Sequence, residues 1–306
     1  MLRNPPNLRQ WMGLGLLGCA TLSWPQACPP EGFPRQRLLE LKAAQFATLA
    51  PAQREPLALG LVACLGNADP LLRDEIAFES LSTLMRSRQV SPELAVKILQ
   101  RLQPQLAAGF DDPRGFIRPF AALTLAEVAR MDRIERFLTD QHWSSLLQTA
   151  TAYLGSVRDY RGFDASEGWR HGVAHGADLL LQVSLNSRAT KPDLDKVLSA
   201  IATQVAPAAH HFFIYGESSR LARPTFYVAQ RGLHTEQEWG AWLQAVVQPA
   251  PLPSWSEAFK SPSGLAKRHN TANFLAALYV LLQEDGSPVA RERMLNPLQE
   301  ALAAVP

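Results

Sequence analysis

The chain has 306 residues, of which 47% are hydrophobic and 19% are charged, with 18 glycines and 23 prolines. This composition fits one large or two small globular domains and excludes disordered and collagen-like classes of protein. The 30 basic residues are interleaved with 28 acidic residues, which gives a formal net charge of +2. Because proteins that bind nucleic acids cluster their basic residues, we expect no nucleic-acid partner.

The first residues have the pattern of an export signal. Arg3 and Arg9 precede an apolar run over residues 11–20, which is too short to span a bilayer but suits the core of a signal peptide. We therefore predict a signal peptide over residues 1–19 and an exported bacterial protein, located in the periplasm or anchored at the outer membrane. Cleavage after residue 18 removes two arginines and leaves no net charge, so electrostatic attachment to a membrane is not expected.

The segment over residues 16–19 ends in Cys19 and resembles the lipobox of bacterial lipoproteins, in which the cysteine is acylated. Ordinary cleavage after Ala20 or Ser23 explains the same stretch, so lipidation at Cys19 and simple secretion stay open as alternatives. We expect contact with a membrane only through such an N-terminal lipid anchor.

Cys28 and Cys64 remain as an even pair once Cys19 is lipidated or removed. In an oxidising compartment, a disulfide between them would join the predicted extended arm, residues 20–33, to the first helices. The alternative is that Cys64, inside the apolar run over residues 59–65, is an ordinary buried thiol.

From residue 34 to residue 306, the sequence predicts a single all-α domain. Apolar residues recur at spacings of three and four, as in Leu57, Leu61 and Leu65, and Pro- and Asp-rich breaks separate segments of helical length. This rhythm predicts stacked antiparallel helical hairpins, as in an α/α superhelix or a HEAT/armadillo-like solenoid, although no repeat consensus is visible. An irregular all-α globule is the alternative. The predicted helices include 165–187 and 206–229.

The helix predicted at 165–187 carries the densest set of polar residues. Asp164 and Glu167 have the spacing of a capping box, which predicts that a helix begins near residue 165. At about 100° per residue, Glu167, His171, His175 and Asp178 then fall on one face of that helix. Glycines recur every four residues on it, and we expect them to make room for a close neighbour or a ligand. They are Gly168, Gly172 and Gly176.

Imidazoles four residues apart can chelate one ion, with Asp178 or Glu167 completing the ligand set. The predicted metal ligands are therefore His171, His175 and Asp178. Since the glutamate that follows the first histidine of a zincin is missing, the sequence does not favour zinc or another divalent metal. An organic or peptide ligand and a buried hydrogen-bonded network are the alternatives.

The pattern Gly-Trp-x-His-x-x-Ala-His-x-x-Asp, at residues 168–178, follows the pair Arg161–Gly162. It resembles the signature of the uncharacterised bacterial family known as domain of unknown function 2785. Similar pieces occur at residues 72–75, 116–120, 217–221 and 273–279, so that the resemblance spans roughly residues 35–300. The resemblance implies an all-helical fold and no established reaction.

We expect a concave surface that binds a protein, a peptide or a small molecule. The competing function is a hydrolase, possibly metal-dependent, that uses the histidines as general base or metal ligands and an arginine to hold an anion. Glu217 and Arg220, three residues apart, also have a plainer explanation as a local ion pair. The candidate site residues are Arg161, Glu167, Trp169, His171, His175, Asp178, Glu217 and Arg220.

Overall fold

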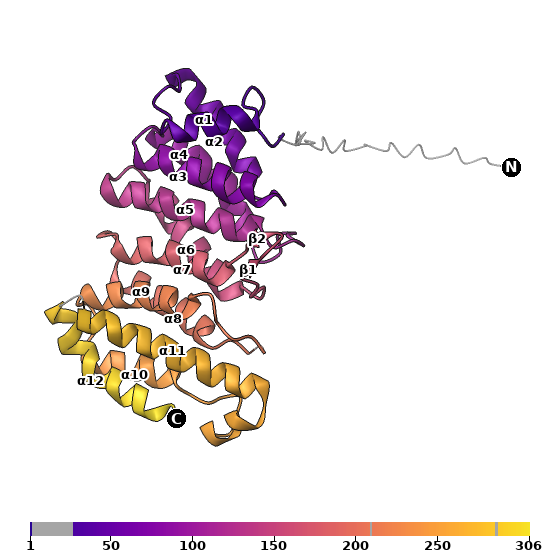
Figure 1. The fold of residues 1–306 in the computed structure, drawn as a ribbon. Coiled ribbons are helices and arrows are strands. Elements are labelled where there is room, and N and C mark those ends of the chain that lie inside the picture. The colour runs from indigo at the N-terminus through magenta and orange to yellow at the C-terminus, as the bar shows by residue number, and fades with distance from the viewer. Residues whose placement is uncertain (2–26, 209, 285–286) are drawn as a thin grey trace.

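The computed structural model describes residue 1 and residues 27–208, 210–284 and 287–306 (Figure 1). The described ranges are almost entirely helical. In chain order the elements are α1 (Arg35–Ala43), α2 (Pro51–Cys64), the π-helix η1 (Leu71–Phe78), α3 (Glu79–Arg86), α4 (Pro92–Leu102), the 3₁₀ turn η2 (Gln103–Leu106), α5 (Ile117–Ile134), α6 (Asp140–Ser156), β1 (Phe163–Asp164), β2 (Gly168–Trp169), α7 (Gly172–Leu185), α8 (Lys191–Val205), α9 (Glu217–Gln230), α10 (Glu236–Val246), the 3₁₀ helix η3 (Trp255–Lys260), α11 (Pro262–Glu284) and α12 (Pro288–Ala304).

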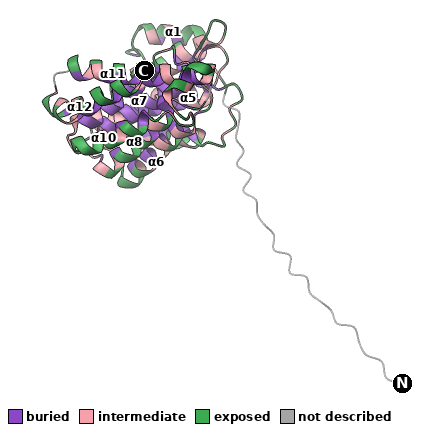
Figure 2. Ribbon diagram, turned by 90° about the horizontal axis from the view of Figure 1, so that it is seen from below, coloured by how far each residue is buried: buried purple, intermediate pink, exposed green. Residues whose placement is uncertain are grey.

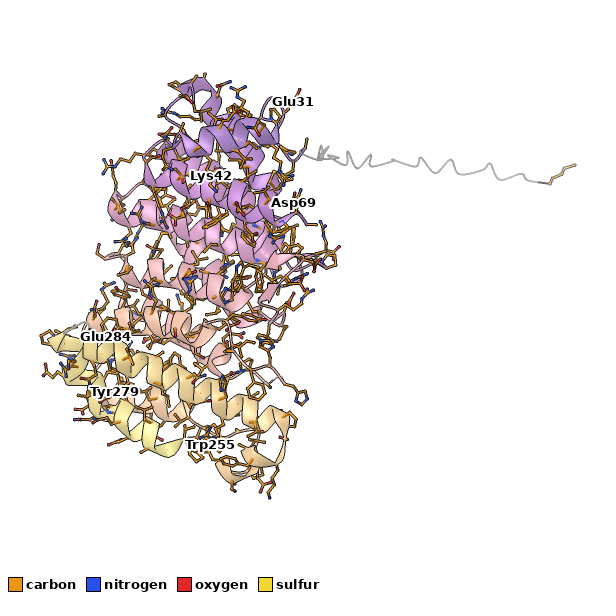
Figure 3. All side chains as sticks on the ribbon, in the orientation of Figure 1. Glu31, Lys42, Asp69, Trp255, Tyr279 and Glu284 are labelled. Carbon is orange, nitrogen blue, oxygen red and sulfur yellow. A yellow bond between two sulfur atoms is a disulfide. The ribbon has the colours of Figure 1, made fainter. Side chains whose placement is uncertain are left out.

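The helices stack in chain order, which confirms the predicted all-α fold of closely packed helices (Figure 1). Helices α3, α5, α7, α9 and α11 pack one against the next and form one layer. In the second layer α6 packs against α8, while α10 and α12 pair at the C-terminal end. Side chains fill the space between successive helices, as Figure 3 shows.

One hydrophobic cluster extends through this stack, from Phe33 near the start to Ala301 in the last helix. Helix α7 lies at its centre, and 11 of its 14 residues are buried. Figure 2 shows buried residues along α5 and α7. Polar side chains on α7 are therefore held in the interior, where each needs a hydrogen-bond partner.

Local signals set the ends of several helices. Ser91 and Thr139 each accept a hydrogen bond from a backbone N–H of the first turn, as N-cap residues do. Thr190 and Thr235 form capping boxes with an acidic residue three positions later. These caps place the starts of α4, α6, α8 and α10.

The helix predicted over residues 165–187 is wrong in its first turns. Residues 163–169 form a short antiparallel hairpin, and α7 begins only at Gly172. The carboxylate of Asp164 does not cap a helix; it accepts hydrogen bonds from the backbone N–H groups of Ser166 and Glu167 and closes the hairpin turn. Gly168, with a φ of 74°, then fixes a backbone that a helix does not allow.

The helix predicted over residues 206–229 is also too long, because α9 starts at Glu217. The preceding loop is tied to α11 by the side chain of Asn270. Its Oδ1 accepts a hydrogen bond from the backbone N–H of Phe213, and its Nδ2 donates to the carbonyl of His211. A side chain thus satisfies backbone groups that a helix would have paired internally.

The predicted glycine spacing makes room for a neighbouring helix. A Cβ on Gly176 would lie 3.0 Å from both Leu154 and Tyr153 of α6, and one on Gly172 would lie 3.4 Å from Tyr153 and Val157. These two positions therefore allow α7 and α6 to approach closely. Gly168 lies in the hairpin and not on α7, so it has no part in the close approach of α7 to α6.

The signal peptide predicted over residues 1–19, the lipidation site at Cys19 and most of the arm over residues 20–33 lie outside the described residues. At the described end of the arm, Cys28 and Cys64 form a disulfide with a Cα–Cα distance of 5.3 Å, which ties the arm to α2. None of the helices in the described ranges combines the length and the apolar character that a bilayer crossing needs.

Candidate functional site

His171 occupies the junction between the hairpin and α7. Its backbone is left-handed, with φ 58° and ψ 40°, and its N–H donates to the carbonyl of Arg161 across the hairpin. Its side chain is 9% exposed and stacks on Trp169 with 4.8 Å between ring centroids. A left-handed backbone is uncommon for any residue but glycine, and such strain is concentrated at functional sites.

His175 lies one turn further along α7 and is buried. Its ring meets the ring of Phe120 edge-on at 5.2 Å and the ring of His171 at 5.6 Å. The structure thus brings the two predicted histidines together.

Burial keeps both imidazoles neutral. Desolvation, together with the charge of Arg220, lowers the pKa of His171 to about 4. Desolvation also lowers the pKa of His175 well below its usual value, and the charge of Arg220 acts in the same direction. Since both values lie below neutral pH, each ring carries one N–H donor and one free lone pair.

The hydrogen bonds of the rings decide which nitrogen keeps the lone pair. The backbone of Tyr215 raises the pKa of His171, as a carbonyl that accepts from the ring N–H does, and the Nε2 has no hydrogen-bond partner among the described residues. We therefore assign the proton to Nδ1. The backbone of Pro119, which has only a carbonyl to offer, acts on the pKa of His175 in the same direction, and the Nδ1 of His175 has no hydrogen-bond partner among the described residues, so we assign its proton to Nε2. The His171 Nε2 and the His175 Nδ1 are therefore buried acceptors without a donor.

A third acceptor comes from α9. The Oε1 of Glu217 lies 3.8 Å from the Nε2 of His171, and its Oε2 accepts a hydrogen bond of 2.9 Å from the backbone N–H of Tyr215. The Glu217 side chain is 3% exposed, and burial raises its pKa. We call His171, His175 and Glu217 the acceptor cluster. The Nε2 of His171 and the Nδ1 of His175 in it have no hydrogen-bond partner among the described residues, so a donor is needed to stabilise them.

Asp178 and Arg220 form an ion pair beside the acceptor cluster. The Nη2 of Arg220 lies 3.1 Å from the Oδ2 of Asp178, and the two side chains are 34% and 14% exposed. Burial raises the pKa of Asp178 to about 6, although Arg220 opposes that rise. The local Glu217–Arg220 pair considered from sequence is not what the structure shows, since each partner bonds elsewhere.

Two predicted site residues lie apart from the acceptor cluster. Glu167 is in the hairpin turn and pairs with Arg170 at 2.7 Å, so it does not share the face of α7 on which it was predicted. Arg161 pairs with Asp159 through two nitrogens and is half exposed. Neither side chain contacts the histidines, because the chain folds back as a hairpin before α7 begins.

Aromatic side chains lie over the acceptor cluster on the hairpin side. Trp169 contacts Phe163 at 5.1 Å and Tyr215 at 5.7 Å between ring centroids, and Phe163 is 49% exposed. We call Phe163, Trp169 and Tyr215 the aromatic cover. Gly162 is required beneath it, because a Cβ there would lie 2.0 Å from the Tyr215 ring.

The predicted metal ligands do not form a ligand set. Asp178 is engaged by Arg220, and Glu167 by Arg170. Among the described residues, no group of three or more His, Cys, Asp or Glu side chains has an arrangement that would hold a metal ion. The arrangement favours a hydrogen-bond donor at the acceptor cluster over a metal ion.

Sequence reasoning missed the part that holds the hairpin in place. The side chain of Arg73, on η1, is fully buried; its Nη2 donates to the carbonyl of Glu167 and its Nε lies 2.6 Å from Asp74. Its guanidinium stacks on Phe116 at 3.9 Å, and that of Arg170 lies 4.4 Å from the same ring. In the sequence, only the family resemblance at residues 72–75 points to a role of Arg73 in holding the hairpin. An arginine next to acidic residues is equally typical of an ordinary interhelical salt bridge.

The comparisons with known proteins identify a family. A family model described as "Protein of unknown function (DUF2785)" matches residues 108–280, which is more than half of the chain and includes α5, the hairpin, α7 and α9. No curated protein and no solved structure matches the chain. The resemblance noted at the Gly-Trp-x-His-x-x-Ala-His-x-x-Asp pattern is thereby confirmed, and this chain belongs to the DUF2785 family.

Proposed function

We propose that this protein is an exported binding module whose ligand donates hydrogen bonds to the acceptor cluster. The observation that supports the proposal is the pair of buried lone pairs, on the Nε2 of His171 and the Nδ1 of His175, that no described residue satisfies. A buried polar atom without a partner costs about 1–3 kcal/mol. A ligand that supplies the missing donors recovers that free energy on binding.

The charges around the acceptor cluster select the kind of donor. A single nitrogen about 2.9 Å from each acceptor would bridge the Nε2 of His171 and the Oε1 of Glu217, which lie 3.8 Å apart. The nearby charge of Arg220 opposes a second positive charge there, as its effect on both histidines shows, and burial, which raises the pKa of Glu217, disfavours the negative charge that would attract one. A neutral N–H donor, such as a primary amide, therefore suits the site better than an ammonium group.

The remainder of the ligand would pack on the aromatic cover. Trp169 and Tyr215 are half-buried, and Phe163 presents about half of its surface to solvent. Flat aromatic or apolar groups gain both area burial and ring stacking against such side chains. The proposed ligand is thus a small molecule or a peptide side chain that joins a neutral amide to an apolar group.

A hydrolase is the second candidate function, and the strained backbone of His171 beside Glu217 is the observation that favours it. A general base works best with a pKa near the working pH. Since the pKa of His171 is lowered to about 4, its neutral ring is a weak base. The electrostatics therefore favour binding over catalysis. Zinc added to the purified protein tests the metal-dependent version, and a stoichiometric rise in melting temperature would support it.

Three benzene derivatives of nearly equal shape test the proposed ligand chemistry. Benzamide offers neutral N–H donors, benzoate offers none, and benzylamine carries a positive charge. We expect benzamide to bind with a Kd near 1 mM, as a fragment of about nine heavy atoms can, and the other two to bind at least tenfold more weakly. Equal or tighter binding of benzoate, or no binding of benzamide at about 10 mM, ten times its expected Kd, would contradict the proposal.

Two variants connect the binding to the acceptor cluster. Glu217→Gln replaces an acceptor oxygen with an N–H donor and should weaken benzamide binding by about tenfold, as expected for one lost hydrogen bond of about 1.4 kcal/mol. His210→Asn, at an exposed position, is the matched control and should leave the Kd unchanged. Equal affinities of the two variants would place benzamide elsewhere on the protein.

Export is supported by the basic start and the short apolar run, and by a disulfide of the kind that persists in oxidising compartments. We expect the tagged full-length chain to be processed and to leave the cytoplasm; an unprocessed cytoplasmic product would contradict export. If Cys19 is acylated, Cys19→Ser should release the protein from the membrane fraction. Unchanged partitioning of that variant would favour simple secretion.

A further inference from the structure

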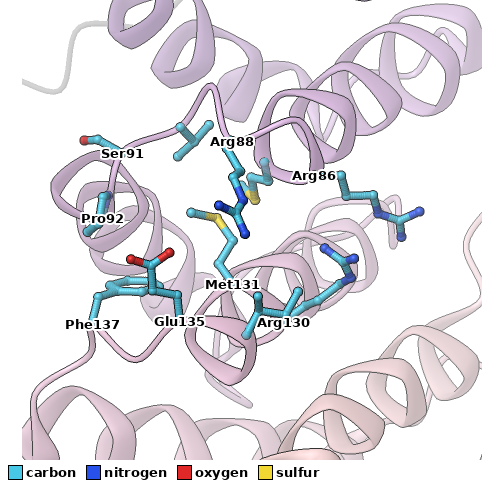
Figure 4. A pocket seen from close by; sticks show the side chains of 11 residues that line it. Arg86, Arg88, Ser91, Pro92, Arg130, Met131, Glu135 and Phe137 are labelled. Atoms are coloured by element: carbon cyan, nitrogen blue, oxygen red, sulfur yellow. The ribbon is translucent and has the colours of Figure 1, made fainter.

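A cavity lies in the N-terminal half of the stack, and it shares no residue with the acceptor cluster or the aromatic cover. It has a volume of about 370 Å³ and lies between the C-terminal end of α3, the loop that leads to α4, and the C-terminal end of α5 (Figure 4). This volume is at the lower end of the range of small-molecule sites, roughly 300–1,000 Å³.

The wall of this cavity combines apolar and cationic side chains. Its apolar part is made by Met85, Val90, Met131 and Phe137, and the first two are buried. Three arginines share the lining with a single acidic residue, Glu135. Methionine-rich walls adapt to apolar groups of various shapes, and guanidinium groups recognise carboxylates.

The three arginines are not equivalent. Arg86 makes two hydrogen bonds to the buried carboxylate of Glu127, so its charge is already neutralised. No described residue makes a hydrogen bond or an ion pair with the guanidinium group of Arg88 or Arg130. Figure 4 shows Arg88 reaching into the cavity toward Met131. Two arginines without an ion-pair partner, together with the single carboxylate of Glu135, thus lie beside an apolar wall.

The backbone of Arg88 gives an independent indication that its side chain has a role. α3 ends in a Schellman motif, in which the N–H of Gln89 donates to the carbonyl of Leu84 and that of Arg88 to the carbonyl of Met85. Arg88 holds the left-handed position of this motif, with φ 59°. Glycine is the usual residue there because it has no Cβ to be strained. An arginine at this place is conformationally costly.

We propose that this cavity binds a free monocarboxylate with a hydrocarbon chain or ring of about eight to twelve carbons. The carboxylate would accept hydrogen bonds from Arg88 and Arg130, and the hydrocarbon part would lie against Met85, Met131 and Phe137. The site is separate from the one proposed for the amide ligand, so either proposal can fail without the other.

Calorimetric titration of the purified protein tests this proposal with decanoate below its micelle concentration. We expect saturable binding of decanoate, binding at least tenfold weaker for decanamide, which has no charge, and none for acetate, which has no chain. Equal binding of decanamide would show that the arginines are not used, and equal binding of acetate would show that the apolar wall is not used. Either result, or no binding of decanoate, would overturn the proposal.

Arg88→Gly separates binding from folding, because glycine fits the left-handed position better than arginine does. This variant should bind decanoate about tenfold more weakly, while its melting temperature stays the same or rises by a few degrees. Arg130→Gln should weaken binding three- to tenfold. Arg35→Gln removes the same charge from a distant ion pair with Asp69 and should leave the affinity within twofold.

A membrane lipid presents similar chemistry, and vesicles distinguish it from a free acid. The protein with its signal peptide removed should not sediment with vesicles of anionic phospholipid. Sedimentation that Arg88→Gly abolishes would assign the cavity to a lipid surface and overturn the proposal of a free carboxylate. Unchanged affinity for decanoate in both arginine variants would place the acid elsewhere and overturn it as well.

Discussion

Acidification should destabilise the protein through His171, and the variant His171→Asn isolates this effect. Asparagine is among the few residues that accept a left-handed backbone, so it fits the φ of 58° at this position. It does not titrate. The difference in stability between the wild type and this variant, followed against pH, therefore reports the protonation of one imidazole.

The size of the effect follows from the two pKa values. The ring has a pKa near 6.5 in the unfolded chain and about 4 in the folded protein, where burial disfavours its charged form. On acidification the unfolded state takes up the proton first, so stability that is present above pH 6.5 is lost progressively toward pH 4. Between pH 7 and pH 5 the loss due to His171 amounts to about 2 kcal/mol.

Urea unfolding at pH 7, 6 and 5, followed by circular dichroism, measures this loss. The free energy of unfolding of the wild type should fall relative to that of His171→Asn by about 2 kcal/mol over this range. His210→Asn, which changes an exposed histidine, should follow the wild type. Parallel pH profiles for the wild type and His171→Asn would refute the conclusion that His171 is buried as a neutral ring.

Three further perturbations test other parts of the structure. Asp178→Asn should raise stability at pH 7 by about 1–3 kcal/mol and lose this gain by pH 4, because burial raises the pKa of the carboxyl to about 6; a loss at pH 7 would mean that the pair with Arg220 outweighs burial. Arg73→Met should cost about 3–5 kcal/mol in thermal unfolding, since it leaves Asp74 without its partner; a cost below 1 kcal/mol would contradict the role of Arg73 in holding the hairpin. Cys64→Ser should lower the free energy of unfolding by roughly 4 kcal/mol, because it opens a loop of 36 residues. Reduction of the wild type should lower it equally, and a much smaller loss would contradict a stabilising disulfide.

The fold could be predicted because the burial of apolar side chains, which contributes most to its stability, leaves a periodic pattern in the chain. Leu57, Leu61 and Leu65 recur with the helical period, and all three are buried as that period requires. Caps such as Thr190 with Asp193 and Thr235 with Glu238 are local in sequence, so they mark the helix starts reliably.

The hairpin could not be predicted, because two local structures compete for the same residues. Asp164 followed by Glu167 suits a capping box, yet the same carboxylate can close a turn by accepting two backbone N–H groups. Long-range contacts decide between them, since the buried guanidinium of Arg73 bonds to the carbonyl of Glu167, 94 positions away. No spacing within residues 160–180 carries this information.

The sequence predicted the part of the site that depends on local spacing, and it failed for the part that depends on long-range contacts. His171 and His175 are one helical turn apart, so their proximity follows from the sequence. The partners of Asp178 and Glu217 depend on how α7 packs against α9, and the pairing of Asp178 with Arg220 appears only when that packing is known. The prediction that Glu167 lies with the histidines fails because it requires a helix that continues through residues 165–171. Arg161 lies apart from them because it pairs with Asp159.

The central claim is that His171 offers an unprotonated Nε2 to a donor on the ligand. A long-range ¹H–¹⁵N correlation spectrum of the histidine side chains, recorded at pH 7 with and without benzamide, tests it most directly. The structure predicts a neutral His171 with its proton on Nδ1, and benzamide should shift the Nε2 signal while leaving that of His210 in place. A charged ring, a proton on Nε2, or an Nε2 signal that saturating benzamide does not move would contradict the claim.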